Sequence, residues 1–82
     1  MNHRRWIWSK HIELRMSKRK ISKDLVEMTV NNPDEVIPAE QDRLIFQKII
    51  GNKLVRVVTE GDTLVTVYVT SKIKKYMKGK QL

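Results

Sequence analysis

The chain has 82 residues, which is enough for one compact domain and too few for separate cofactor and substrate domains. It has no cysteine, no apolar run long enough to span a bilayer, and no apolar stretch after the basic residues 1–8. Disulfide scaffolds, thiolate zinc sites, membrane spans and signal peptides are therefore not expected, and we predict a soluble cytoplasmic domain over residues 1–82. The formal net charge of +8 favours a polyanionic partner, chiefly nucleic acid, although a merely solubilising surface would have the same composition.

Two helices are expected in the first third of the chain. Residues 6–8 form a short apolar entry, either an edge strand or a cap on the core, and Ser9 is a helix N-cap for a helix to about Lys18. Ser22 is the N-cap of a second helix, with Ile21 and Val26 at the spacing of a hydrophobic staple. We expect its buried stripe to consist of Leu25, Met28 and Val30, and its end to lie at Asn31-Asn32-Pro33.

An acidic connection over residues 34–42 is expected to lead into three strands, at 43–50, 53–59 and 63–70, which are rich in β-branched residues. Gly51-Asn52 predicts a two-residue hairpin loop that pairs Ile50 with Lys53. The turn near Gly61 has two or three residues. A three-residue turn is favoured, because its register places the valines of the last strand beside Val55 and Val57: Val65, Val67 and Val69. The same register sets Arg56 opposite Thr66.

The tail from Ser71 to Lys78 has the pattern of a short basic helix, with Ser71 as N-cap and Gly79 as stop. The order of elements predicts an α+β fold. Its two N-terminal helices would pack on a three-stranded, or four-stranded, antiparallel sheet, and the C-terminal basic helix could cover the second face of that sheet.

The charge is divided along the chain. Residues 1–23 carry +7, residues 24–62 carry −4, and residues 63–82 carry +5. An evenly basic surface is therefore not expected. If the two basic ends meet around Arg56 and Tyr68, they would form one groove for RNA.

Metal and cofactor sites are not expected. The histidines are His3 and His11, without acidic partners at ligand spacing, and no glycine-rich phosphate loop or nucleophile elbow is present.

A cationic cluster is predicted on the first helix, where His11, Arg15 and either Lys18 or Arg19 share one face. Histidine moves protons near neutral pH and arginine binds phosphate in a bidentate manner, so this face could take part in phosphodiester chemistry. The alternative is a solvent-facing basic stripe.

The second face of the sheet carries Arg56 and Tyr68. If this face is open, the two side chains could bind RNA by phosphate contact and base stacking. If the last helix covers it, Arg56 would pair with an acid such as Glu40 or Asp42. Trp6 and Trp8 are expected to be hydrophobic anchors. The tail supplies an electrostatic footprint of lysines: Lys72, Lys74, Lys75, Lys78 and Lys80.

Several short motifs occur in a fixed order: His11-x-x-x-Arg15-Met16-x-x-Arg19-x-Ile21-Ser22, Asn32-Pro33-Asp34, residues 54–58 (LVRVV) and residues 65–68 (VTVY). This order resembles a family of small uncharacterised prokaryotic domains that is similar to the RelE/ParE-like and BrnT-like toxins of toxin–antitoxin pairs. The resemblance covers about residues 7–70. It implies a RelE-like fold of two helices on an antiparallel sheet.

The resemblance also implies a function: a toxin-like RNA-binding protein, in its specific form a metal-independent endoribonuclease of a type II toxin–antitoxin pair. His11, Arg15, Arg56 and Tyr68 would be the catalytic residues. His11 would act as base or acid, the arginines would hold phosphate, and Tyr68 would stack or donate a proton. The implied partners are RNA or the ribosome and a small acidic antitoxin. The residues expected to bind nucleic acid are Lys18, Arg19, Lys72 and Lys75.

Two other functions fit the same residues. One is a non-catalytic module that binds nucleic acid or a protein through its basic ends. The other is a structural role in a homodimer formed through strand edges or the second sheet face, so both monomer and homodimer remain open.

Overall fold

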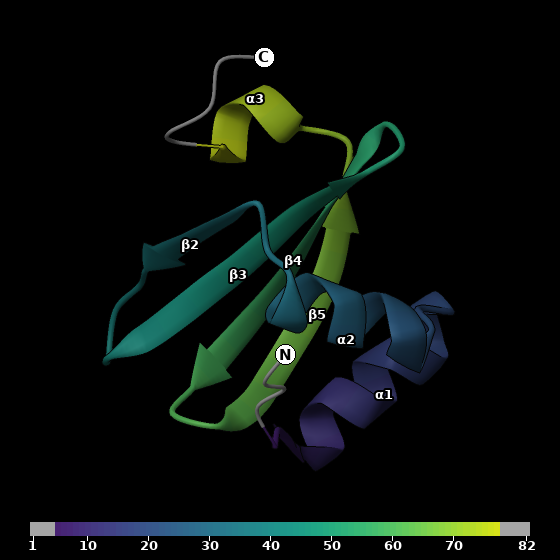
Figure 1. Ribbon diagram of the computed structural model, residues 1–82. Coiled ribbons are helices and arrows are strands. Elements are labelled where there is room, and N and C mark those ends of the chain that lie inside the picture. The colour runs from purple at the N-terminus through teal and green to yellow at the C-terminus, as the bar shows by residue number, and fades with distance from the viewer. Residues whose placement is uncertain (1–4, 78–82) are drawn as a thin grey trace.

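The computed structural model describes residues 5–77 (Figure 1). Its sheet has five strands in the order β1-β5-β4-β3-β2, with β1 parallel to β5 and all other pairs antiparallel. The α+β class is confirmed, but the predicted sheet of three or four antiparallel strands is wrong. The elements are β1 (Ile7–Trp8), α1 (Lys10–Arg19), α2 (Lys23–Asn31), β2 (Glu35–Pro38), β3 (Arg43–Ile50), β4 (Lys53–Glu60), β5 (Thr63–Thr70) and α3 (Ile73–Tyr76).

Both predicted helix starts are confirmed by their caps. The Ser9 hydroxyl accepts a hydrogen bond from the Ile12 amide at 3.0 Å, and the Ser22 hydroxyl accepts one from the Leu25 amide at 3.2 Å. Each bond satisfies an amide that the first turn of a helix leaves without a partner. The local sequence thus determines where α1 and α2 begin.

One face of the sheet, here called the helix face, packs against α1 and α2. Val26 and Val30 of α2 and Ile12 of α1 are buried there against strand residues. The stripe predicted for α2 is partly wrong: Met28 is 48% exposed, and Thr29 is buried instead. The Thr29 hydroxyl donates to the Leu25 carbonyl at 2.9 Å, so its burial leaves no polar group unsatisfied. The strand side chains of this core are Phe46, Val55, Val57, Leu64 and Val67.

The two additional strands lie at the edges of the sheet. Residues 6–8 contribute β1, a two-residue strand beside the start of β5. The connection predicted over residues 34–42 contains β2, where Val36 pairs with Phe46 and Ile37 with Ile45. Pro38 ends β2 at the edge, which is where a strand tolerates proline.

The β3–β4 hairpin has the predicted register, with Ile50 opposite Lys53. The predicted register of β4 with β5 is wrong. The loop has two residues, Gly61-Asp62, and a bulge between Val58 and Thr59 leaves Val65 without a partner in the register. Beyond the bulge, Arg56 lies opposite Tyr68 instead of Thr66. Beyond the bulge the displacement is two residues, so Val67 and Val69 keep their predicted face. On the turn side the predicted face is wrong, because Leu64 instead of Val65 lies in the core against the helices.

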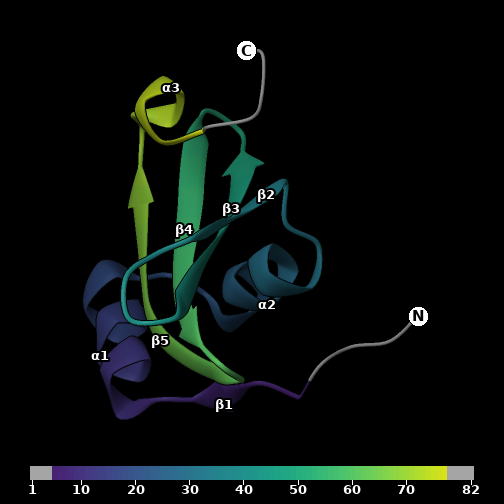
Figure 2. The same ribbon diagram turned by 90° about the vertical axis from the view of Figure 1, so that its left-hand side faces the viewer.

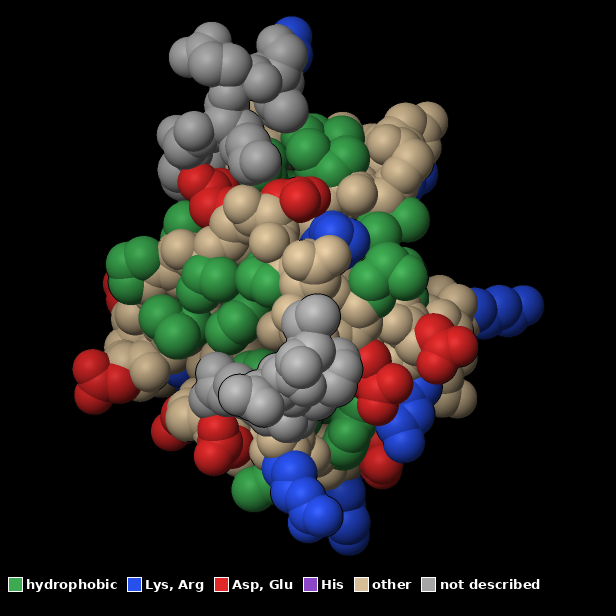
Figure 3. All heavy atoms as spheres, viewed as in Figure 1, with side chains coloured by type: hydrophobic (Ala, Val, Ile, Leu, Met, Phe, Trp, Pro, Cys, Tyr) green, Lys and Arg blue, Asp and Glu red, His purple; other side chains and the backbone are tan. Residues whose placement is uncertain are grey.

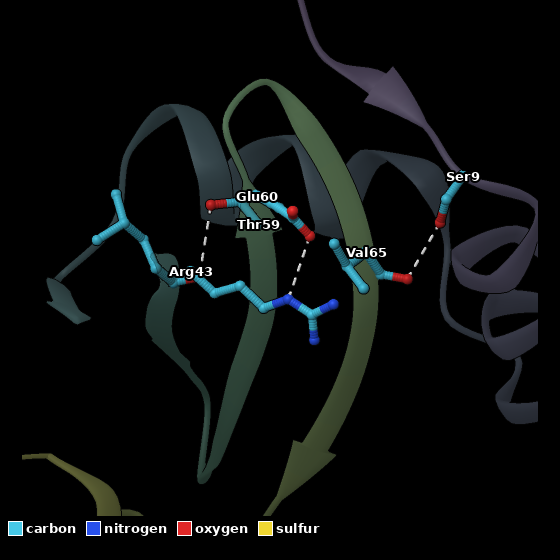
Figure 4. Close-up of polar contacts among 6 residues, drawn as sticks. Ser9, Arg43, Thr59, Glu60 and Val65 are labelled. Carbon is cyan, nitrogen blue, oxygen red and sulfur yellow. Dashed lines mark hydrogen bonds and ion pairs between the residues drawn. The ribbon is translucent and has the colours of Figure 1, made fainter. Parts of the chain in front are cut away.

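The bulge is held from outside the hairpin. Ser9, between β1 and α1, donates its hydroxyl proton to the Val65 carbonyl at 3.1 Å, as Figure 4 shows. The Ser9 amide also donates to the Leu64 carbonyl at 3.3 Å. One serine therefore caps α1 and fixes the edge of β5.

The tail helix is shorter than predicted. The helix α3 spans Ile73–Tyr76, and Ser71 does not cap it, since the residue before the helix is Lys72 and no side chain forms a cap bond. The predicted stop at Gly79 and the lysines Lys78 and Lys80 lie outside the described residues. Figures 1 and 2 place α3 at one end of the sheet and α1 toward the other. None of the helices described is long and apolar enough to cross a bilayer.

Candidate functional site

Four polar side chains form a line across the second face of the sheet. Glu35 on β2 lies opposite Gln47 on β3, Gln47 lies opposite Arg56 on β4, and Arg56 lies opposite Tyr68 on β5. Directly opposed residues on one face have neighbouring side chains. We call these four residues the polar row.

Hydrogen bonds connect the row from end to end. Arg56 Nε donates to Gln47 Oε1 at 2.8 Å, and Gln47 Nε2 donates to Glu35 Oε1 at 2.7 Å. Arg56 Nη1 donates to the Tyr68 hydroxyl. A guanidinium has only donors and an ionised carboxylate has only acceptors, so the Gln47 amide has one orientation that satisfies both neighbours. Gln47 therefore connects the cation to the carboxylate.

Arg56 is a buried cation without a direct carboxylate partner. Its side chain is 5% exposed, and the ion pairs among the described residues join Arg43 to Glu60 and Lys48 to Asp34. The expected pairing of a covered Arg56 with Glu40 or Asp42 is thus not found. Instead the guanidinium lies 4.1 Å from the ring centroid of Tyr76 and 5.5 Å from that of Tyr68. The Gln47 amide, the Tyr68 hydroxyl and the rings of Tyr68 and Tyr76 replace water around this charge.

The remaining amino group of Arg56, Nη2, is the part of the site that can meet a ligand. Its neighbours Nε and Nη1 hold Gln47 and Tyr68. No buried side-chain nitrogen or oxygen of the described residues lacks a hydrogen-bond partner. Nη2 has no partner in that part of the chain and is not fully buried, so it keeps a small contact with solvent. A guanidinium edge at the surface is a donor for a phosphate oxygen.

The helix α3 completes this site. The Tyr76 carbonyl and Met77 sulfur accept from Gln47 Nε2 at 3.0 and 3.4 Å, so α3 packs over the middle of the row. Lys72, Lys74 and Lys75 are exposed on the same segment, and Lys75 Nζ lies 5.4 Å from the Tyr76 ring centroid. A hollow of about 480 Å³ beside them has Ile49 and Ile73 in its lining. The site is therefore a covered cation beneath a segment that carries exposed lysines.

The predicted cluster on α1 also forms. Arg15 Nε donates to His11 Nε2 at 3.3 Å, and Lys18 lies on the same face, around a hollow of about 190 Å³ that Leu14 also lines. His11, Leu14 and Lys18 are exposed, and Arg19 is exposed at the end of the helix. Because all four lining residues belong to one helix, this hollow is a surface feature of α1.

The structure brings Arg56 to Tyr68 and His11 to Arg15, but it does not bring the two pairs together. Ile12 anchors α1 in the core on the helix face, whereas the polar row lies on the opposite face of the sheet. Lys72 and Lys75 accompany the row, and Lys18 and Arg19 accompany His11. On the side seen in Figure 3, acidic side chains lie among the basic ones. Within residues 5–77, the two basic ends therefore do not form a single groove.

Three contributors to this site were not predicted as site residues: Gln47, Glu35 and Tyr76. Gln47 could have been found, because the Gly51-Asn52 hairpin register already places it opposite Arg56. Glu35 lies on a strand where the sequence predicts a connection. Tyr76 ends α3, the tail helix that the sequence allows to cover this face, but it was not assigned to the site. Within residues 5–77, no group of three His, Asp or Glu side chains is placed to hold a metal, and His3 lies outside those residues.

A known family covers most of the chain. Residues 8–69 match the family described as a domain of unknown function (DUF4258), and the chain belongs to that family. The searches of curated proteins and of solved structures found no match.

Proposed function

We propose that the protein is a toxin-like RNA-binding protein that contacts the RNA backbone at the polar row. The observation that carries the proposal is Arg56, a buried cation with no carboxylate beside it and one amino group left for an anion. A positive charge that the fold leaves without a direct counter-ion favours an anionic ligand at its open edge. Phosphate is the anion that RNA presents along its whole length.

The surroundings of Arg56 support a nucleic acid over a free anion. Lys72, Lys74 and Lys75 extend the positive charge along α3, and such a stripe can follow a phosphate backbone. Tyr68 and Tyr76 are half-buried, and aromatic rings beside cations are the elements that bind unpaired bases. The preferred ligand is therefore single-stranded RNA.

In its specific form the proposal includes metal-independent cleavage. The ribose 2′-oxygen would attack the adjacent phosphorus, the bond to the 5′-oxygen would break, and a 2′,3′-cyclic phosphate would remain. Arg56 Nη2 would stabilise the charge on the phosphorane. The Tyr68 hydroxyl accepts from Arg56 Nη1, so its own proton is free to pass to the leaving 5′-oxygen. The proton of the 2′-hydroxyl would pass to water, because His11 lies on the other face of the sheet.

Binding is tested with two variants of equal charge. Lys72→Gln/Lys75→Gln removes two charges beside the row, and Lys18→Gln/Arg19→Gln removes two on α1. We expect the first pair to weaken binding of a single-stranded RNA by about tenfold or more and to lower the slope of log K against log salt by ~1.4, at ~0.7 per phosphate contact. Equal losses in both variants, or a larger loss on α1, would reject the row as the binding site.

Cleavage is tested with Tyr68→Phe, which keeps the ring and removes the hydroxyl. We expect a loss of cleavage of about 100-fold, within the range of a general acid, with RNA affinity changed by less than about threefold. The measurement is product formation from a labelled RNA in the presence of chelator. Cleavage that His11→Ala abolishes and Tyr68→Phe leaves intact would place the chemistry on α1.

The second candidate is a non-catalytic nucleic-acid-binding module, and the position of His11 favours it. The base predicted for cleavage is absent from the face that carries Arg56, and Arg56 itself is 5% exposed. For such a module we expect salt-dependent RNA binding with intact RNA after prolonged incubation.

A toxin-like protein also requires a neutralising partner, and we propose a small acidic antitoxin for that role. Its charge would complement the lysines of α3, which border an apolar hollow. Co-expression of an adjacent short acidic reading frame should restore growth to cells that express this protein. Growth unaffected by the protein alone would count against the toxin-like assignment.

A further inference from the structure

The outer edge of β5 is open over its second half. The strand β1 pairs with Thr63 and Leu64, and Ser9 occupies the next carbonyl, at Val65. From Thr66 to Thr70, the backbone of the described residues makes ladder bonds on one side only, to β4. Figure 2 shows this part of β5 at the margin of the sheet. Along this five-residue segment, every second residue therefore presents unpaired N–H and C=O groups at the edge.

The open segment has none of the sequence features that usually prevent edge pairing. Residues 66–70 read Thr-Val-Tyr-Val-Thr, without a charge, a proline or a glycine. The opposite edge of the sheet is different, since β2 is short, carries Glu35 and ends in Pro38. Lysine, proline and short length are the features that protect an edge strand. The contrast marks the β5 edge as a pairing surface.

The edge is also complementary to itself. The sequence of residues 66–70 reads the same in both directions about Tyr68, and Tyr68 is the midpoint of the open segment. Antiparallel pairing about a two-fold axis would set threonine against threonine and valine against valine. Such pairs of β-branched residues are favourable across a sheet.

We propose that two copies of this chain pair through their β5 edges, antiparallel and with Tyr68 opposite Tyr68 of the partner subunit. Val69, which is 38% exposed on the helix face, would then lie beside Val67 of the partner subunit. The chain turns away after Thr70, so the pairing uses the open segment and stops before β1. The two sheets would join into one.

The dimer would also join the two polar rows. Each polar row ends at Tyr68, which would lie at the two-fold axis. The two rows would therefore lie end to end on the same face of the joined sheet. Three strand spacings would separate the two Arg56 residues, a distance of ~14 Å. Association through the edge needs no RNA, and it can therefore succeed or fail independently of the proposed function.

Cysteine pairs test both the contact and its register. The chain has no cysteine, and Thr66 lies opposite Thr70 of the partner subunit in the proposed pairing. Directly opposed residues of an antiparallel pair have the Cα separation of a disulfide, whereas positions 66 and 70 of one strand are ~13 Å apart. We expect Thr66→Cys/Thr70→Cys to form a covalent dimer on mild oxidation at least about tenfold faster than either single variant. An equimolar mixture of the two single variants should give mainly the mixed dimer.

A charge on the edge gives a second test that leaves the site intact. Val69→Lys and Val36→Lys make the same change at similarly exposed positions, 38% and 41%, on opposite edges of the sheet. Sedimentation of the protein at the high concentrations used for NMR should show a dimer for the unsubstituted chain and for Val36→Lys. It should show a monomer for Val69→Lys. A monomeric original chain, or cross-linking of the double cysteine variant no faster than the single variants, would overturn the proposal.

Discussion

At the scale of single residues, Arg56 is the feature that needs most support from its surroundings. Burial removes water from the guanidinium, and no carboxylate among the described residues replaces it directly. Gln47 compensates by accepting from Arg56 and donating to Glu35. The row therefore stabilises a cation in the sheet while leaving one of its amino groups available.

We predict that Gln47→Leu lowers the free energy of unfolding by about 2–3 kcal/mol, because it leaves a buried charged donor without its acceptor. Urea denaturation of Gln47→Leu, Arg56→Leu and the double variant measures this. The double variant should lose less than the sum of the two single losses, since it removes donor and acceptor together. Strictly additive losses would mean that the two side chains do not depend on each other.

Lys20 offers a residue-scale prediction remote from the site. It follows α1 in the left-handed region, at φ 56°, and its side chain is exposed. Lys20→Gly should raise the free energy of unfolding by about 0.5–1 kcal/mol, because glycine adopts this conformation without steric cost. Thermal unfolding of the variant beside Lys18→Gly, a position within the helix that should lose stability, gives the matched comparison.

At the scale of elements, the two N-cap serines make a matched pair. Ser22 caps α2 and is exposed, whereas Ser9 caps α1 and also donates to the Val65 carbonyl (Figure 4). We predict a loss of about 1 kcal/mol for Ser22→Ala and about 2 kcal/mol for Ser9→Ala, since the second change removes a cap and a tertiary bond. Equal losses in chemical denaturation would show that the bond to β5 contributes nothing.

The elements also show which parts of the fold the sequence could predict. Ser9, Ser22 and Gly51-Asn52 are local signals, so helix starts and the first hairpin register were predictable. The β4–β5 register was not, because the bulge at Val65 is held by Ser9, distant in the chain. From the sequence alone, Glu35–Pro38 has the composition of an acidic connection, and it is a strand because it pairs with β3. For the site, Arg56 and Tyr68 were predicted, but their contact depended on the bulge.

At the scale of the whole molecule, the fold determines where the basic segments of the sequence lie on the surface. The described parts of the +7 and +5 segments do not meet: α1 packs on the helix face, and α3 packs over the polar row (Figures 1 and 2). A long RNA could contact both ends only by passing around the sheet. The protein therefore has two basic regions, and the proposed function depends on which of them binds.

The most direct measurement is an amide and side-chain NMR titration of the isotope-labelled protein with a short single-stranded RNA. We expect shift changes centred on Tyr68, Tyr76 and the lysines of α3, and a perturbed Arg56 Nε resonance, all declining as salt increases. Changes centred on His11, Arg15 and Lys18, or no change at low salt, would contradict it.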